Sequence, residues 1–188
     1  MKKSFSFFLP FGVALSLLVV LGTARDSAAA SASEAPAQAP SPITASSSLP
    51  LEEARVIIDA AVAYARNLKL RMTVAVLDDG GHLISADRMD GASFNGERTA
   101  TGKAFTAVMT RRPSAAAAEL SKTAPERYYG IMNMYPGQVY LVPGGLPLTV
   151  NNRIVGAVGV SGLPSGMDEK ACEAGIAAWQ KYREAAKK

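Results

Sequence analysis

Residues 99–110 carry the pattern that most suggests ligand chemistry. At helical spacing, one stripe of this segment holds small and polar residues: Thr99, Gly102, Lys103, Thr106 and Thr110. A glycine inside a helix costs about 1 kcal/mol relative to alanine, and it lets a flat surface approach the backbone. Beside Gly102, Lys103 offers a cation and Thr106 a hydroxyl. The stripe predicts a binding surface for a ligand with an acidic edge; the alternative is a helix–helix crossing over Gly102, with Lys103 reaching water.

Two further candidates, His82 and Arg88, lie at the ends of a predicted strand. Arg88 and Asp90 are two residues apart, so they point to the same side and could pair or meet a ligand. His82, the only histidine, could ligate iron or act as a base, or it could simply face water. Methionines are alternative soft ligands for haem iron or adaptable packing: Met89, Met132, Met134 and Met167.

Clusters of aromatic residues and of glycines are weaker indications of a ligand-binding site. Three tyrosines could stack on a planar ligand or close the core beneath a loop: Tyr128, Tyr129 and Tyr135. Gly144 and Gly145 could expose backbone N–H groups to a carboxylate, or form an ordinary hairpin turn. The sequence contains no Walker, GxGxxG, CxxC or HExxH motif. These clusters leave the reaction class open.

The first 30 residues have the three parts of a secretory signal peptide. Lys2 and Lys3 precede an apolar run over 5–21, and Ala28-Ala29-Ala30 provides an A-x-A cleavage site. The run is shorter than the roughly 20 apolar residues that span a bilayer; a retained membrane anchor is the alternative. We therefore expect an exported protein, periplasmic or secreted, with no stable membrane insertion after cleavage.

Composition excludes several function classes. Removal of 1–30 would lower the net charge from +4 to +2, and no basic stripe with interleaved aromatics remains, which argues against nucleic-acid binding. One cysteine, Cys172, cannot form an intramolecular disulfide, and a single histidine argues against a zinc site of the usual His/Cys type.

The remaining chain divides into a linker, 31–48, and one domain, 49–188. The linker is rich in alanine, proline and serine and has no apolar periodicity, so we expect it to be disordered. In the domain, helices are predicted over 50–67, 95–110 and 114–122 and from Asp168, with an irregular segment over 124–136. The first helix has an apolar stripe at helical spacing, and the second has a stripe of small apolar residues: Ala100, Ala104, Ala107 and Val108. Strands are predicted over 72–77, 82–88, 138–142, 146–150 and 153–160, with hairpin turns at 78–81 and at Asn151-Asn152. This order favours an α+β fold, a five-stranded antiparallel sheet with packed helices.

Five ordered motifs resemble the GlcG/HbpS family, which includes haem-binding and haem-degrading domain proteins. They are 72–83 (MTVAVLDDGGHL), 88–92 (RMDGA), 103–107 (KAFTA), 143–147 (PGGLP) and 155–162 (VGAVGVSG), followed by Asp168-Glu169. The resemblance covers essentially 49–188 and implies a profilin-like fold, homo-oligomers and, in some members, bound haem. By motif, Thr106 would match a haem-contacting hydroxyl, and Lys103 and Arg88 would suit the propionates.

The resemblance favours a protein that binds haem, or another flat anionic small molecule, beside Gly102, with Thr106 or His82 as the possible iron ligand. Scavenging, buffering or sensing of haem would suit a weak neutral ligand such as threonine. One alternative is an enzyme, either haem-degrading or acting on a small carboxylate, with Lys103 or His82 as acid/base. The other is a non-catalytic oligomeric interaction domain.

Overall fold

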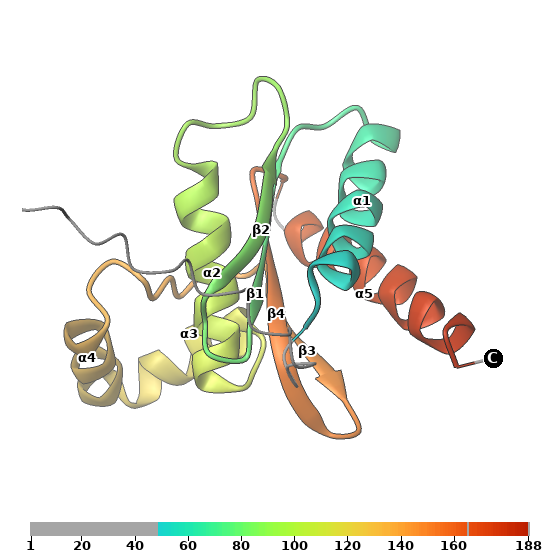
Figure 1. The fold of residues 1–188 in the computed structure, drawn as a ribbon. Coiled ribbons are helices and arrows are strands. Elements are labelled where there is room, and N and C mark those ends of the chain that lie inside the picture. The colour runs from blue at the N-terminus through green and yellow to red at the C-terminus, as the bar shows by residue number, and fades with distance from the viewer. Residues whose placement is uncertain (1–48, 165, 188) are drawn as a thin grey trace, which may run out of the picture. The chain divides into compact units, whose positions relative to one another are not determined.

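A four-stranded antiparallel sheet separates two layers of helices (Figure 1). The computed structural model describes residues 49–164 and 166–187. The predicted signal peptide, 1–30, and linker, 31–48, lie outside the described residues. Helices α1 and α5 cover one face of the sheet, and α2, with α3 and α4 beyond it, covers the other.

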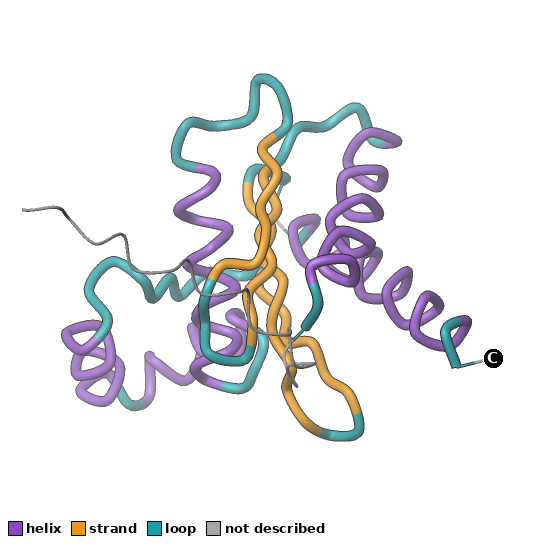
Figure 2. The backbone as a smooth tube through the Cα atoms, in the orientation of Figure 1, coloured by secondary structure: helices purple, strands orange, loops and turns teal. Residues whose placement is uncertain are grey.

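The strands pair in the order β2-β1-β4-β3. Figure 2 shows the strands between the helices on either side. Their bounds are β1 Thr73–Asp78, β2 Leu83–Arg88, β3 Gly145–Val150 and β4 Arg153–Ser161. The central strands β1 and β4 are almost continuously buried, as expected of apolar strands covered on both faces. Two hairpins, β1–β2 and β3–β4, confirm the predictions made from Asp78–Gly81 and from Asn151-Asn152.

The larger core lies between the sheet and the pair formed by α1 (Leu51–Asn67) and α5 (Met167–Ala185). The two helices approach closely because Gly175 has no side chain: a Cβ there would lie 2.8 Å from the Ile57 carbonyl oxygen. Trp179 fills the space beside this crossing, and its indole Nε1 donates to Glu53. The apolar stripe predicted along the first helix is therefore the buried one.

The smaller core lies beneath α2 (Gly96–Thr110), which crosses β1 and β4. Its alanine stripe, Ala100, Ala104 and Ala107, is fully buried against the sheet, as the spacing predicts. A Cβ on Gly159 of β4 would overlap the Ala100 carbonyl, so the helix rests directly on the strand backbone. Helix α3 (Ser114–Thr123) follows as predicted, and the segment predicted to be irregular contains α4 (Pro125–Met134).

The predicted fifth strand, 138–142, is not formed, and the sheet has four strands among the described residues. Side chains satisfy the backbone of this segment in place of a neighbouring strand. The Tyr140 N–H donates to the Thr106 hydroxyl at 2.8 Å, and Ser114 Oγ donates to the Val142 carbonyl at 2.7 Å. Val139 is buried in the α2 core, so the segment is anchored to α2 and α3.

Candidate functional site

Lys103 of α2 is buried in an ion pair. Its Nζ donates to Asp168 Oδ2 at 2.6 Å and to the Val160 carbonyl at 3.0 Å, and its side chain is 4% exposed. Asp168, in the first turn of α5, also accepts the Leu163 N–H. A buried charge requires such partners because desolvation is costly. In this conformation the ammonium group therefore joins α2 to β4 and α5.

Thr106 and Gly102 are covered by the chain itself. The Thr106 hydroxyl is fully buried, donating to the Gly102 carbonyl at 2.8 Å and accepting the Tyr140 N–H. A Cβ on Gly102 would lie 3.0 Å from Tyr140 Cβ and 3.3 Å from the Gln138 carbonyl. The close approach that Gly102 predicted is thus made by residues 138–140. Haem contact through Thr106 or Lys103 stays a prediction, and it would require this segment or the ion pair to move.

His82 and Arg88 belong to different sites. They lie at opposite ends of β2, about 20 Å apart at the usual rise per residue. The His82 ring is 83% exposed, and its Nδ1 lies 3.3 Å from Asp78 Oδ2. The two side chains therefore do not lie next to one another in a single chain.

A groove of about 600 Å³ surrounds Arg88. We call it the α1–β2 groove; it is lined by Val62, Arg66, Lys69, Leu70, Arg71, Ala86, Asp87, Arg88, Met89 and Asp90. Its volume lies within the roughly 300–1,000 Å³ typical of small-molecule sites. It is more than twice as large as the cavity of about 260 Å³ that Val142 and Leu163 border.

Backbone geometry at the end of α1 brings the groove's two sides together. Lys69 adopts a left-handed conformation (φ 57°), and the Leu70 N–H returns to the Ala65 carbonyl, which ends the helix. The chain then enters β1, whose register pairs Thr73 with Arg88. The helix end and the strand end therefore face one another across the sheet edge.

The groove carries four cationic side chains and two carboxylates: Arg66, Lys69, Arg71 and Arg88 against Asp87 and Asp90. Asp87 accepts from Arg55 at 2.9 Å, so part of its charge is compensated from outside the groove. Arg88 Nη1 donates to the Ala92 carbonyl at 3.0 Å. The surplus of positive charge favours an anionic ligand.

Sequence reasoning identified Arg88, Met89 and Asp90 at this place and missed the cations from the helix end. Arg66, Lys69 and Arg71 follow no periodic pattern with Arg88, because only the strand register makes them neighbours. The sequence feature that could have indicated these cations is the cluster of basic residues at the end of the first predicted helix.

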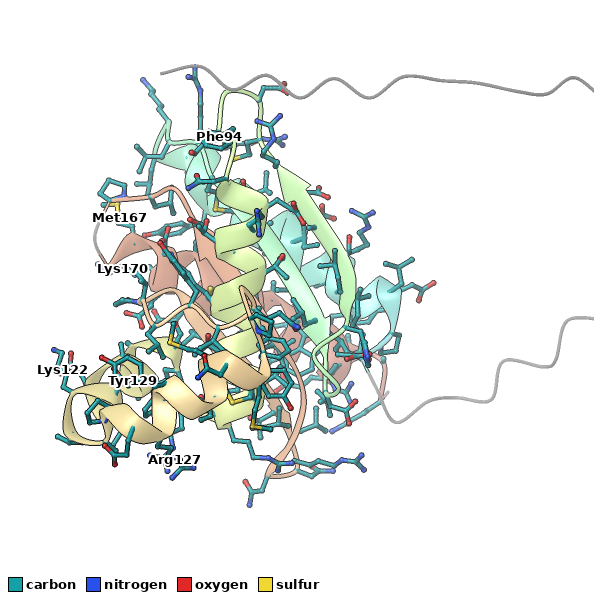
Figure 3. All side chains as sticks on the ribbon, turned by 90° about the vertical axis from the view of Figure 1, so that its left-hand side faces the viewer. Phe94, Lys122, Arg127, Tyr129, Met167 and Lys170 are labelled. Atoms are coloured by element: carbon teal, nitrogen blue, oxygen red, sulfur yellow. The ribbon has the colours of Figure 1, made fainter. Side chains whose placement is uncertain are left out.

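The tyrosine and glycine candidates do not form one site. Tyr128 is buried, Tyr135 packs edge-on against Phe105 with ring centroids 5.3 Å apart, and Tyr129 is 67% exposed on the outer side of α4 (Figure 3). The Gly145 N–H donates to Ser114 Oγ, so it is not available to a carboxylate. Among the described methionines, Met132 and Met134 are exposed, and both lie on α4.

Residues 49–164 and 166–187 contain neither a metal-binding cluster nor a membrane-spanning helix. No group of three or more histidine, cysteine, aspartate or glutamate side chains in these ranges lies close enough to hold a metal ion. None of the described helices has the length and apolar character needed to cross a membrane.

Comparisons with known proteins find a matching family model and several similar proteins. The family model described as "Haem degrading protein HbpS-like" matches residues 49–177. Protein GlcG of Escherichia coli K12 is 32% identical over 108 residues, covering 57% of this chain and 77% of GlcG. A crystal structure of a double mutant of HbpS from Streptomyces reticuli is 35% identical with a TM-score of 0.64, covering 76% of this chain and 95% of that one.

A solved structure named as a haem complex also resembles the chain. The crystal structure titled as a complex of PduOC with heme is 26% identical with a TM-score of 0.63, and the match covers 70% of this chain and 94% of that one.

Proposed function

Because this chain belongs to the HbpS-like family of haem degrading proteins, we propose that it is an exported haem-binding protein. We place the haem in the α1–β2 groove. The observation that carries this placement is a surplus of cations in a groove of about 600 Å³. The complex of PduOC with heme supports tetrapyrrole binding by this fold.

The groove residues fit both parts of a haem molecule. Two propionates require cationic partners, and the groove offers Arg66, Lys69, Arg71 and Arg88. The macrocycle requires apolar surface, which Val62, Leu70 and Ala86 provide. Met89 adds a thioether, a known type of axial ligand for haem iron. When bound, haem would supply the iron centre, and the chain would hold and orient it.

Exposed cations favour reversible binding. Arg66, Lys69, Arg71 and Arg88 are all exposed, and solvent-exposed ion pairs contribute only about 0.2–1 kcal/mol each. Haem held in this way would exchange readily, which suits scavenging, buffering or sensing of haem outside the cytoplasm.

A haem titration followed through the Soret band tests the proposal. The double variant Arg71→Ala/Arg88→Ala removes two groove cations, and Arg112→Ala/Arg127→Ala removes two exposed cations elsewhere. We expect the groove variant to bind haem about 10-fold more weakly, equivalent to ~1.4 kcal/mol, and the control to bind as the unmodified chain does. Equal binding by both variants would exclude the groove.

The family's description favours haem degradation as a second candidate. Enzymatic degradation would bleach the Soret band and release iron when a reductant is supplied, and added catalase would not prevent it. Bleaching that catalase abolishes would instead indicate peroxide damage to haem, and would leave binding as the activity.

A further inference from the structure

A second cavity, of about 180 Å³, lies beside the first two turns of α2. We call it the Gly137 pocket; it is lined by Gly81, Glu97, Arg98, Thr101, Gly102, Phe105, Gly137 and Gln138. None of these residues lines the α1–β2 groove, so the two sites are independent. The volume is below that of sites for drug-sized ligands, which restricts the occupant to a few non-hydrogen atoms.

The pocket presents one cation and one anion. Arg98 Nη2 would lie 4.0 Å from a Cβ built on Gly137, so its guanidinium lies at the pocket wall. Glu97 is the neighbouring residue in the first turn of α2. Both side chains are exposed, and among the described residues neither forms a hydrogen bond or an ion pair.

One wall of the pocket is rigid and apolar. The Phe105 ring packs against Gly81: a Cβ on Gly81 would lie 2.9 Å from Phe105 Cε2. The centroid of the Phe105 ring lies 5.3 Å from that of the Tyr135 ring. Gly81 and Gly137 both have positive φ, at 82° and 72°, which keeps side chains out of the turns that border the pocket.

Thr101 adds an unsatisfied polar group. Its hydroxyl oxygen is shielded from water and has no hydrogen-bond partner in the described part of the chain. Thr73 Oγ1 shares this property, but it is packed against the backbone of Gly96, whereas Thr101 lines a cavity.

We propose that the Gly137 pocket binds a small zwitterion, such as a free α-amino acid with a short apolar side chain. The carboxylate pairs with Arg98, the ammonium group pairs with Glu97, and the side chain contacts Phe105. A ligand with only one charge would leave either Glu97 or Arg98 without a partner, so both charges are needed for the tightest binding.

Isothermal titration calorimetry of the full chain with three probes tests the proposal: free alanine, propionate and ethylammonium. With so few atoms, alanine should bind with a Kd of about 1 mM. We expect propionate and ethylammonium to bind at least about 5-fold more weakly. Equal affinity for alanine and propionate, or no heat with any probe, would overturn the proposal.

Charge-neutral variants assign each contact. Arg98→Gln should weaken alanine and propionate binding about 5-fold or more, and Glu97→Gln should weaken alanine but not propionate. The matched control is Glu126→Gln/Arg127→Gln, which changes the same dipeptide in the first turn of α4. Loss of alanine binding in the control, or no loss in Arg98→Gln, would contradict the assignment.

Haem titration of Arg98→Gln should match that of the unmodified chain, which separates this site from the α1–β2 groove.

Discussion

At the scale of single residues, the buried pair of Lys103 and Asp168 is the most consequential interaction. It is the ion pair with the least exposed side chains among the described residues, at 4% and 13%. Lys103 Nζ also packs 3.0 Å from the position of a Cβ on Gly144, so no larger residue fits there. The residue that resembled a ligand contact in the sequence therefore has a structural role in this conformation.

Lys103→Met should destabilise the fold by about 3–5 kcal/mol, because it leaves the Asp168 carboxylate buried without its cation. Urea unfolding monitored by circular dichroism would measure the change in the free energy of unfolding. The double variant Lys103→Met/Asp168→Leu should recover part of the loss. A single variant as stable as the unmodified protein would show that the pair contributes nothing.

Cys172 should be unreactive in the folded protein. Burial, assisted by the Asp168 carboxylate, raises the pKa of its thiol far above its ordinary value. The folded state keeps this proton while an unfolded thiol loses it above about pH 8.5, so the thiol's contribution to stability is complete below that pH and declines above it. Alkylation at pH 8 should be slow without denaturant and fast with it. Fast alkylation of the native protein would contradict this.

At the scale of elements, α2 organises both the sheet and the segment that follows α4. Its alanine stripe rests on β1 and β4, and its Thr106 anchors Tyr140. The sequence predicted the helix, its alanine stripe and both hairpins, because periodicity and turn residues are local signals. The strand expected over 138–142 has the right residue types, yet a threonine and a serine from distant helices bind its backbone.

Removing the Thr106 hydroxyl should release the 138–142 segment from α2. Thr106→Val leaves the Tyr140 N–H without its partner, and loss of this partly buried hydrogen bond should cost about 1 kcal/mol. Hydrogen exchange measured by NMR should show the Tyr140 amide exchanging at least about 5-fold faster, while amides of β1 stay protected. Unchanged protection of Tyr140 would mean that other contacts hold the segment.

The arrangement of α1, β1 and β2 also explains why the sequence indicated only some of the residues that line the α1–β2 groove. Arg88 and Met89 were visible as a motif, but their partners Arg66 and Arg71 precede them by about 20 residues and meet them only through the β1–β2 register. Conversely, Lys103 and Thr106 looked available because the sequence does not reveal that Asp168 and Tyr140 contact them.

At the scale of the whole molecule, exposed apolar side chains gather on α3, α4 and the segment after them. They are Leu120, Tyr129, Met132, Met134, Tyr135, Tyr140 and Val142. Figure 3 shows Tyr129 with Lys122 and Arg127 on the outer side of these helices. Large exposed apolar patches commonly mark interaction surfaces, which agrees with the homo-oligomer expected from the resemblance to the GlcG/HbpS family.

We therefore expect the protein to form a homo-oligomer, and Tyr129→Lys/Met134→Lys to weaken it. Both side chains are more than two-thirds exposed in the single chain, so the substitutions should leave the fold intact. Sedimentation velocity would show a shift from an oligomer toward the monomer in the variant, with an unchanged circular dichroism spectrum. A monomeric unmodified chain would contradict the expectation.

NMR titration with gallium protoporphyrin, a diamagnetic haem analogue, tests the central claim most directly. Binding in the α1–β2 groove predicts the largest amide shift changes at 69–71 and 88–90, with little change at Gly102 and Thr106. Shift changes centred on Gly102 and Thr106, with the groove amides unaffected, would contradict the placement. They would instead support haem binding beside Gly102, as predicted from the sequence.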